Sequence, residues 1–112
     1  MAYDEDLAQR VRENLLGTPN LNEMKMFGGI AFLVNGNMAC GVSQNDLMVR
    51  LGAEASERAL AAPHVKPFAM SGRAPMSGWV LVEPAGIAAE EALQEWVRQG
   101  LRYASSLPPK AK

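Results

Sequence analysis

A cysteine and a histidine are the first residues here whose chemistry suggests an active site, and each occurs once, as Cys40 and His64. A thiolate activated by an imidazole is an effective nucleophile only when the two side chains can share a hydrogen bond. Cys40 lies among alternating apolar residues and is predicted to face the core, where thiols are inert. His64 follows a predicted helix and is expected in solvent. The sequence therefore favours a non-enzymatic function, and no catalytic residue, cofactor or metal ligand is predicted.

A pair of glycines is the second candidate, because Met26-Phe27-Gly28-Gly29 could turn backbone N–H groups toward a phosphate. Phosphate-binding loops, however, carry further glycines or a Gly-Lys-Ser/Thr sequence and precede a helix. These glycines interrupt a strand-like segment instead. A β-bulge, or the close approach of a packed helix, is the favoured interpretation.

Arg50 ends a predicted strand and is expected to point away from the core. Its predicted neighbours are apolar or small, which is unusual for a plain solvated face. In one interpretation this face binds a protein partner or a second copy of the chain, because Arg and Met are enriched in interface cores. In the other, a helix over residues 53–62 or the C-terminal segment covers it, and both stay open. The neighbours are Ala31, Leu33, Ala39, Gly41 and Met48.

Arg73 lies in a glycine-containing loop and could bind an anion, although an ordinary solvated arginine is favoured. Trp79 and Trp96 have apolar neighbours and are expected to pack in the core rather than stack on a ligand. The candidate interaction surface predicted from the sequence consists of Leu33, Met48, Arg50 and Arg73.

Composition sets outer limits on function. The length of 112 residues is sufficient for one domain with a hydrophobic core. Its composition, with 48% hydrophobic and 21% charged residues, is ordinary for a globular protein. Eleven basic and twelve acidic residues give a net charge of -1, which argues against nucleic-acid binding through Lys25, Arg50, Lys66 and Arg73. The acidic N-terminus is no signal peptide, no segment is long enough to cross a membrane, and a lone cysteine excludes an intrachain disulfide. We therefore expect a cytoplasmic protein.

Hydrophobic periodicity predicts the elements of the first half. Asp4 opens an amphipathic helix that Gly17 ends. Residues 24–34 alternate as one strand interrupted by the two glycines, and two further strands follow around Cys40 and over residues 47–51. Together they predict a three-stranded antiparallel meander.

The turn between the first two strands, Asn35-Gly36-Asn37, has two possible lengths. An Asn-Gly pair alone favours a two-residue turn. A three-residue loop, with Asn37 left-handed, instead places Ile30, Phe32 and Val34 on one face with Met38, Cys40 and Val42. We prefer this second arrangement because it gives one continuous apolar face.

The second half is predicted as a helix over residues 53–62, an extended segment over 64–70, a strand over 78–83 and a long helix over 90–105. Pro67 confines the extended segment to a sheet edge or a bulge, whereas the apolar strand is expected to be central. Gly100, on the apolar stripe of the last helix, is expected to allow close approach to the sheet. The prediction is an α+β fold with helices packed on a largely antiparallel sheet, one domain over residues 1–106 and a flexible tail over 107–112.

Taken together, these segments resemble the TfoX/Sxy N-terminal domain family. The resemblance spans nearly the whole chain and depends on the order and spacing of its pieces. Within it, Met26, Phe27, Gly28, Gly29, Gly72, Gly78 and Trp79 are expected to be architectural. The matching residues are 25–32, 35–38, 46–50, Phe68, Met70, Gly72, Arg73, Met76, Gly78, Trp79, Trp96, Val97 and 107–110.

The resemblance implies a sandwich of one helix, a three-stranded meander, a helix, two strands and a helix. Two-domain members regulate natural competence together with a cyclic-AMP receptor protein. Because this sequence ends at Lys112, a stand-alone domain is expected. We hypothesise a regulatory or protein-interaction domain, with a protein partner and a possible homodimer through the outer sheet face. A nucleic-acid-binding transcriptional regulator is the alternative, and a small-molecule sensor a weaker one.

Overall fold

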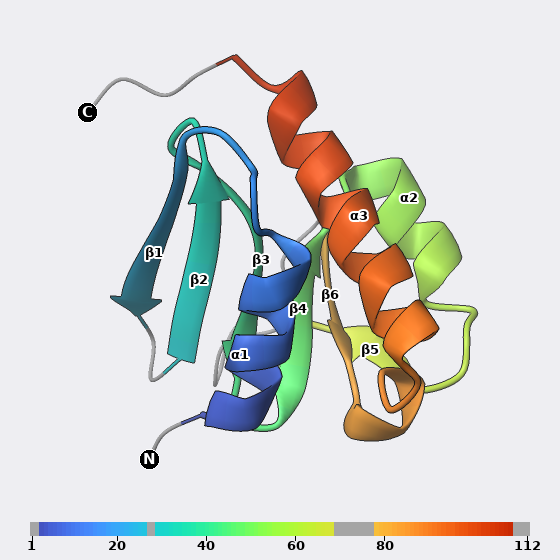
Figure 1. Cartoon of the computed structure of the whole chain (residues 1–112). Helices are drawn as coiled ribbons and strands as arrows, with labels where there is room; N and C mark the ends of the chain where they lie inside the picture. The colour runs from blue at the N-terminus through green and yellow to red at the C-terminus, as the bar shows by residue number, and fades with distance from the viewer. Residues whose placement is uncertain (1–2, 27–28, 69–77, 109–112) are drawn as a thin grey trace.

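The computed structural model describes residues 3–26, 29–68 and 78–108 (Figure 1). Its elements alternate in the way that the changing hydrophobic period predicts, with helices at both ends of the described chain. In order they are α1 (Glu5–Asn14), β1 (Leu21–Met26), β2 (Gly29–Val34), β3 (Asn37–Ser43), β4 (Asp46–Arg50), α2 (Ala53–Ala59), β5 (Val65–Pro67), β6 (Trp79–Val82), the 3-10 turn η1 (Pro84–Gly86) and α3 (Glu90–Ser106).

The strands form one six-stranded antiparallel sheet in the order β1-β2-β3-β4-β6-β5. Helices α1 and α3 lie side by side on one face of it, and α2 contacts β6 (Figure 1). Side chains of α1 and α3 enclose the core against the sheet. The predicted α+β fold is confirmed, as are the edge position of β5 and the internal position of β6.

The predicted single strand over residues 24–34 is wrong in one respect, because the segment is a hairpin of two strands, β1 and β2. Met24 pairs with Ala31, and Lys25 pairs with Ile30. Residues of opposite parity on the two strands therefore share a face. Met24 was expected on the face of Ile30, but it lies on the opposite face with Ala31. The meander therefore has four strands rather than three.

Close packing between neighbouring strands explains why residue 29, the second of the paired glycines, is a glycine. A Cβ atom at this position would fall on the carbonyl oxygen of Val42 in the neighbouring strand β3. The close approach that was expected from a helix thus comes from a strand. Phe27 and Gly28 lie outside the described residues.

The turn between β2 and β3 differs from the preferred prediction. It has two residues, Asn35 and Gly36, with φ angles of 54° and 82°, and Asn37 pairs directly with Val34. The apolar face is nevertheless continuous, because β3 contains a bulge. Leu33 pairs with Met38 but Phe32 pairs with Cys40, which leaves Ala39 as the extra residue.

This bulge moves two side chains from where the sequence placed them. Met38 opposes Leu33 and so leaves the predicted core face. Ala39, expected on the outer face beside Arg50, is fully buried in a cluster with Val34 and Ala104 of α3. Beyond the bulge, Cys40 pairs with Val49 in β4 and Val42 pairs with Leu47.

Gly100 lets α3 lie directly on the bulge. A Cβ atom there would fall on the carbonyl oxygen of Ala39 and within 3.3 Å of a methyl group of Val49. The predicted helix boundaries hold within one residue for α3, whereas α2 ends at Ala59 and is shorter than predicted. The C-cap of α3, Leu107, is followed by Pro108, whose carbonyl oxygen accepts a 2.9 Å hydrogen bond from the Asn37 amide, so the first part of the predicted tail contacts β3.

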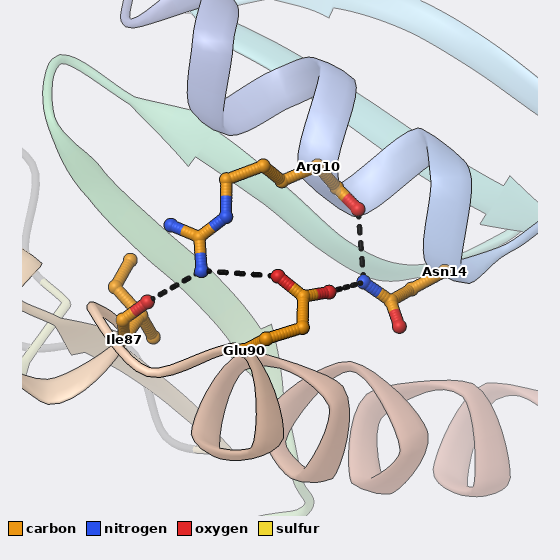
Figure 2. A network of polar contacts seen from close by, with 4 residues as sticks. All are labelled: Arg10, Asn14, Ile87 and Glu90. Atoms are coloured by element: carbon orange, nitrogen blue, oxygen red, sulfur yellow. Dashed lines mark hydrogen bonds and ion pairs between the residues drawn. The ribbon is translucent and has the colours of Figure 1, made fainter.

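Polar contacts connect α1 to the start of α3 (Figure 2). Arg10 donates a 2.8 Å hydrogen bond to the carbonyl oxygen of Ile87 and lies 3.4 Å from a carboxylate oxygen of Glu90. The other oxygen of Glu90 accepts a 3.1 Å hydrogen bond from Asn14. Because the ion pair is partly exposed, it fixes the relative position of the helices more than it stabilises the fold.

Candidate functional site

Arg50, the predicted centre of an interaction surface, lies between two aromatic rings. Its guanidinium carbon is 5.8 Å from the ring centroid of Trp79 and 5.6 Å from that of Tyr103. Both distances are within the range of cation–π attraction. Because Arg50 is the last residue of β4, its side chain reaches past the end of the strand to the C-terminal half of α3.

The sheet itself aligns Arg50 with the first ring. Arg50 and Trp79 are direct cross-strand partners of β4 and β6, so their side chains share a face and lie next to each other. Phe68, just after β5, extends the aromatic surface, with its ring centroid 5.9 Å from that of Trp79 at an interplanar angle of 53°. We call Arg50, Phe68, Trp79 and Tyr103 the aromatic–arginine cluster.

Two glycines make this arrangement possible. Gly52 has a φ of 89°, and a Cβ atom there would lie 2.8 Å from the Tyr103 ring. Gly78 has a φ of 90°, and its carbonyl oxygen accepts hydrogen bonds from the N–H groups of Leu51 and Gly52 at 2.8 and 3.2 Å. Glycine adopts such backbone angles without strain. The geometry of Gly78 fits the architectural role expected of it.

The charge of Arg50 distinguishes it from most other arginines of the described chain. Arg10, Arg12, Arg58 and Arg98 each lie within 4.0 Å of a carboxylate oxygen. Over residues 3–26, 29–68 and 78–108, no carboxylate lies within that distance of Arg50. The guanidinium therefore keeps its positive charge uncompensated by these residues, while two aromatic rings lie within 6 Å of it.

The cluster can bind groups of two chemical kinds. Guanidinium N–H groups at the rim of the rings can donate to a carboxylate, and the rings offer apolar area that is rigid. Arg, Trp and Tyr are the residue types that most often contribute strongly to protein–protein binding. The described part of the cluster contains no nucleophile and no acid–base pair.

The other predicted surface residues are distributed unevenly. Leu33 is partly exposed, but Met48 is only 3% exposed and Ala31 is fully buried. Arg73, like Gly72, falls outside the described residues. Of the predicted surface, the described structure therefore leaves Arg50 and Leu33 as the residues with solvent contact.

Cys40 and His64 do not form a nucleophile pair. Cys40 is completely buried, and burial raises the pKa of its thiol to about 12. His64 is exposed in the turn after α2, where it has a φ of 67°. Within the described chain no group of three or more metal-binding side chains occurs.

The basic residues considered for nucleic-acid binding do not form one patch. Lys25 is on β1 and Lys66 on β5, the two opposite edges of the sheet. Lys66 also lies 3.3 Å from Asp46 and 3.5 Å from Glu83, and its pKa is raised chiefly by the hydrogen bond to Asp46. Its charge is thus largely compensated.

Sequence reasoning missed Phe68 and Tyr103 as members of the cluster. Tyr103 does not belong to the apolar stripe of α3, although it follows Gly100 by three residues and so lies near the same face. From this three-residue spacing in the sequence, the position of Tyr103 near the sheet could have been predicted. Trp79 was expected to pack in the core, but it is partly exposed beside Arg50.

These features define an α+β fold with a partly exposed aromatic–arginine cluster among the described residues. Comparison with family models agrees with this fold class and also identifies the family. The model of the TfoX N-terminal domain matches residues 13–104, so the chain belongs to the TfoX N-terminal domain family. Searches of curated proteins and of solved structures found no match. No helix in the described part of the chain is long and apolar enough to span a membrane.

Proposed function

We propose that this protein is a non-enzymatic regulatory domain that acts by binding another protein through the aromatic–arginine cluster. The observation that carries the proposal is the Arg50 guanidinium held between Trp79 and Tyr103, with no described carboxylate within 4.0 Å. Membership of the TfoX N-terminal domain family supports a regulatory role, in competence or transcription, for a domain of this kind. The buried free thiol of Cys40 supports a reducing, cytoplasmic location.

A protein partner fits the cluster better than nucleic acid does. Affinity for DNA or RNA depends on several cations that neutralise neighbouring phosphates. Here the lysines are at opposite edges of the sheet, and Lys66 is paired with Asp46 and Glu83. A partner segment with a carboxylate and an apolar side chain would satisfy both the guanidinium and the rings.

The proposal is tested by comparing tagged wild-type protein with two arginine variants in an extract of the cells that make it. Arg50→Ala removes the cation between the rings. Arg98→Ala removes an arginine of α3 that is exposed and paired with Glu95 at 3.3 Å, and serves as the matched control. Circular dichroism confirms that both variants fold.

We expect at least one captured protein to be lost with Arg50→Ala and retained with Arg98→Ala. After purification, that protein should bind Arg50→Ala about thirtyfold more weakly, the size of a strong interface residue. Equal binding to all three proteins contradicts the proposal. Tight binding of duplex DNA at low salt that Arg50→Ala abolishes also contradicts it and supports the nucleic-acid alternative.

A further inference from the structure

The two edges of the sheet differ in how well they are protected. The edge strand β5 has three residues and ends in Pro67, which offers few free hydrogen-bonding groups. The opposite edge strand, β1, has six residues, and neither proline nor a register shift occurs in its pairing with β2. Residues 22–25 are all exposed. Such an edge is a template for pairing with another strand.

The hydrogen-bond phase of β1 shows which backbone groups are free. The N–H of Asn35 donates a 3.1 Å hydrogen bond to the carbonyl oxygen of Asn20, one pair beyond the end of the β1–β2 ladder. Hydrogen-bonded pairs alternate along an antiparallel ladder, so even-numbered residues of β1 bond to β2. The backbone groups of Leu21, Glu23 and Lys25 therefore point away from the sheet.

Side chains along this edge are complementary to themselves. Met24, which is 50% exposed, lies between Glu23 and Lys25, and these two charged residues are on the face that α1 covers. If an antiparallel copy of β1 is placed with its two-fold axis at Met24, Glu23 lies opposite the partner's Lys25. The same contact occurs twice because of the symmetry.

We propose that two copies of this chain pair through β1 in antiparallel register, with Met24 at the two-fold axis, and extend the sheet across both subunits. Glu23 and the partner's Lys25 then form hydrogen-bonded backbone pairs with opposite charges. The two copies of Met24 form the closer, non-hydrogen-bonded pair and cover each other's exposed side chain.

Other registers with the same hydrogen-bond phase are less favourable. A shift in one direction places Glu23 opposite itself, and a shift in the other direction places Lys25 opposite itself. Like charges directly opposite each other destabilise a strand pair. The charges of β1 thus select a single register.

The negative charge of Glu23 is stabilised by Arg12 of the same subunit. Arg12 of α1 donates hydrogen bonds of 2.6 and 3.0 Å to its two oxygens, and these bonds hold the pKa of Glu23 below its usual range. An open cleft of about 510 Å³ borders this pair between α1 and β1, which leaves room for the partner's lysine side chain. This inference is independent of the proposed function, because Arg50 lies on β4 in the interior of the sheet.

Charge reversal tests the register by sedimentation velocity from about 1 µM to about 1 mM, where weak dimers dissociate. Lys25→Glu and Glu23→Lys each replace two attractive contacts with two repulsive ones. We expect each variant alone to dimerise about tenfold more weakly than the wild type, or not at all. An equimolar mixture of the two should dimerise again, because every charged pair is then opposite in sign.

A cysteine introduced at the two-fold axis tests the same register without altering any charge. Met24→Cys should form an intersubunit disulfide under mild oxidation, because paired residues across strands lie within disulfide distance. Asn22→Cys on the same strand face is the matched control, since its two copies lie far apart in this register. Cys40 is buried and does not compete. A monomer at all concentrations, or equal cross-linking of both variants, overturns the proposal.

Discussion

Cys40 shows how its neighbours decide the chemistry of a single residue. Its cross-strand partners are Phe32 in β2 and Val49 in β4, and all three side chains are completely buried. An ionised thiolate in these surroundings would lose its hydration, so burial raises the pKa of the thiol to about 12. At neutral pH this thiol is a small apolar group that fills the core.

The raised pKa makes stability depend on alkaline pH. The unfolded thiol ionises near pH 9.0, whereas the folded thiol stays protonated up to about 12. The contribution of the buried, neutral thiol to the free energy of unfolding is therefore fully present below pH 9. It is lost as pH rises from 9 toward 12, by up to about 1.4 kcal/mol per pH unit. Urea unfolding between pH 8 and 10 measures it by comparing the wild type with Cys40→Ala.

The other ionisable groups are common to both proteins, so their effect cancels in this comparison. We expect the stability advantage of the wild type over Cys40→Ala to shrink as pH rises above about 9. Parallel pH profiles for the two proteins would show that the thiol is not shielded in the folded state.

At the scale of elements, the contact between α3 and the bulge of β3 determines how closely helix and sheet can pack. The bulge at Ala39 turns its side chain toward Ala104, and Gly100 leaves room for the backbone of β3. A glycine within a helix costs about 1 kcal/mol relative to alanine. The close packing that it permits offsets this cost.

Gly100→Ala should therefore destabilise the protein even though alanine favours helix. The added methyl group meets backbone atoms of Ala39, and relieving such overpacking costs about 1–3 kcal/mol. Because the gain in helix propensity offsets about 1 kcal/mol of this cost, we expect a net loss of up to about 2 kcal/mol in the free energy of unfolding, measured in urea.

The control for this substitution is Ser105→Ala, at an exposed position of the same helix. It should leave stability unchanged or raise it by about 0.5 kcal/mol. A gain in stability from Gly100→Ala would mean that α3 does not depend on close contact with the bulge.

On the scale of the whole molecule, one core connects all layers. Buried residues from α1, from every strand between β2 and β6 except β5, and from α3 belong to a single cluster. The Arg10–Glu90–Asn14 contacts fasten α1 to the start of α3 (Figure 2). A chain organised in this way should unfold as one unit.

The two tryptophans allow that expectation to be measured. Trp96→Phe leaves Trp79 to report on the sheet, and Trp79→Phe leaves Trp96 to report on α3. In each variant, the urea midpoint from fluorescence should equal its midpoint from far-ultraviolet circular dichroism. Different midpoints within one variant would indicate that the helices and the sheet unfold separately.

Protein concentration must be low in this experiment, because a β1 dimer would raise the midpoint by mass action. The Lys25→Glu variant provides the reference for a monomer. Its midpoint should not change with concentration, whereas that of the wild type should rise.

Features that local patterns control could be predicted from the amino-acid sequence. The stripe of α3 including Gly100, the edge position that Pro67 imposes on β5 and the internal position of the apolar strand β6 were all predicted, because periodicity and backbone chemistry act over a few residues. The burial of Cys40 followed from the same alternation.

Tertiary structure decided the features that depend on pairing between distant residues. The alternation of apolar residues continues from Met24 to Val34, so it could not reveal that residues 24–34 belong to two strands with reversed faces. The bulge at Ala39 lies against Gly100 of α3, a residue far away in the sequence. The aromatic–arginine cluster unites residues from β4, β6 and α3 with Phe68. Only folding brings Arg50 within 6 Å of the Trp79 and Tyr103 rings and Phe68 within 6 Å of Trp79.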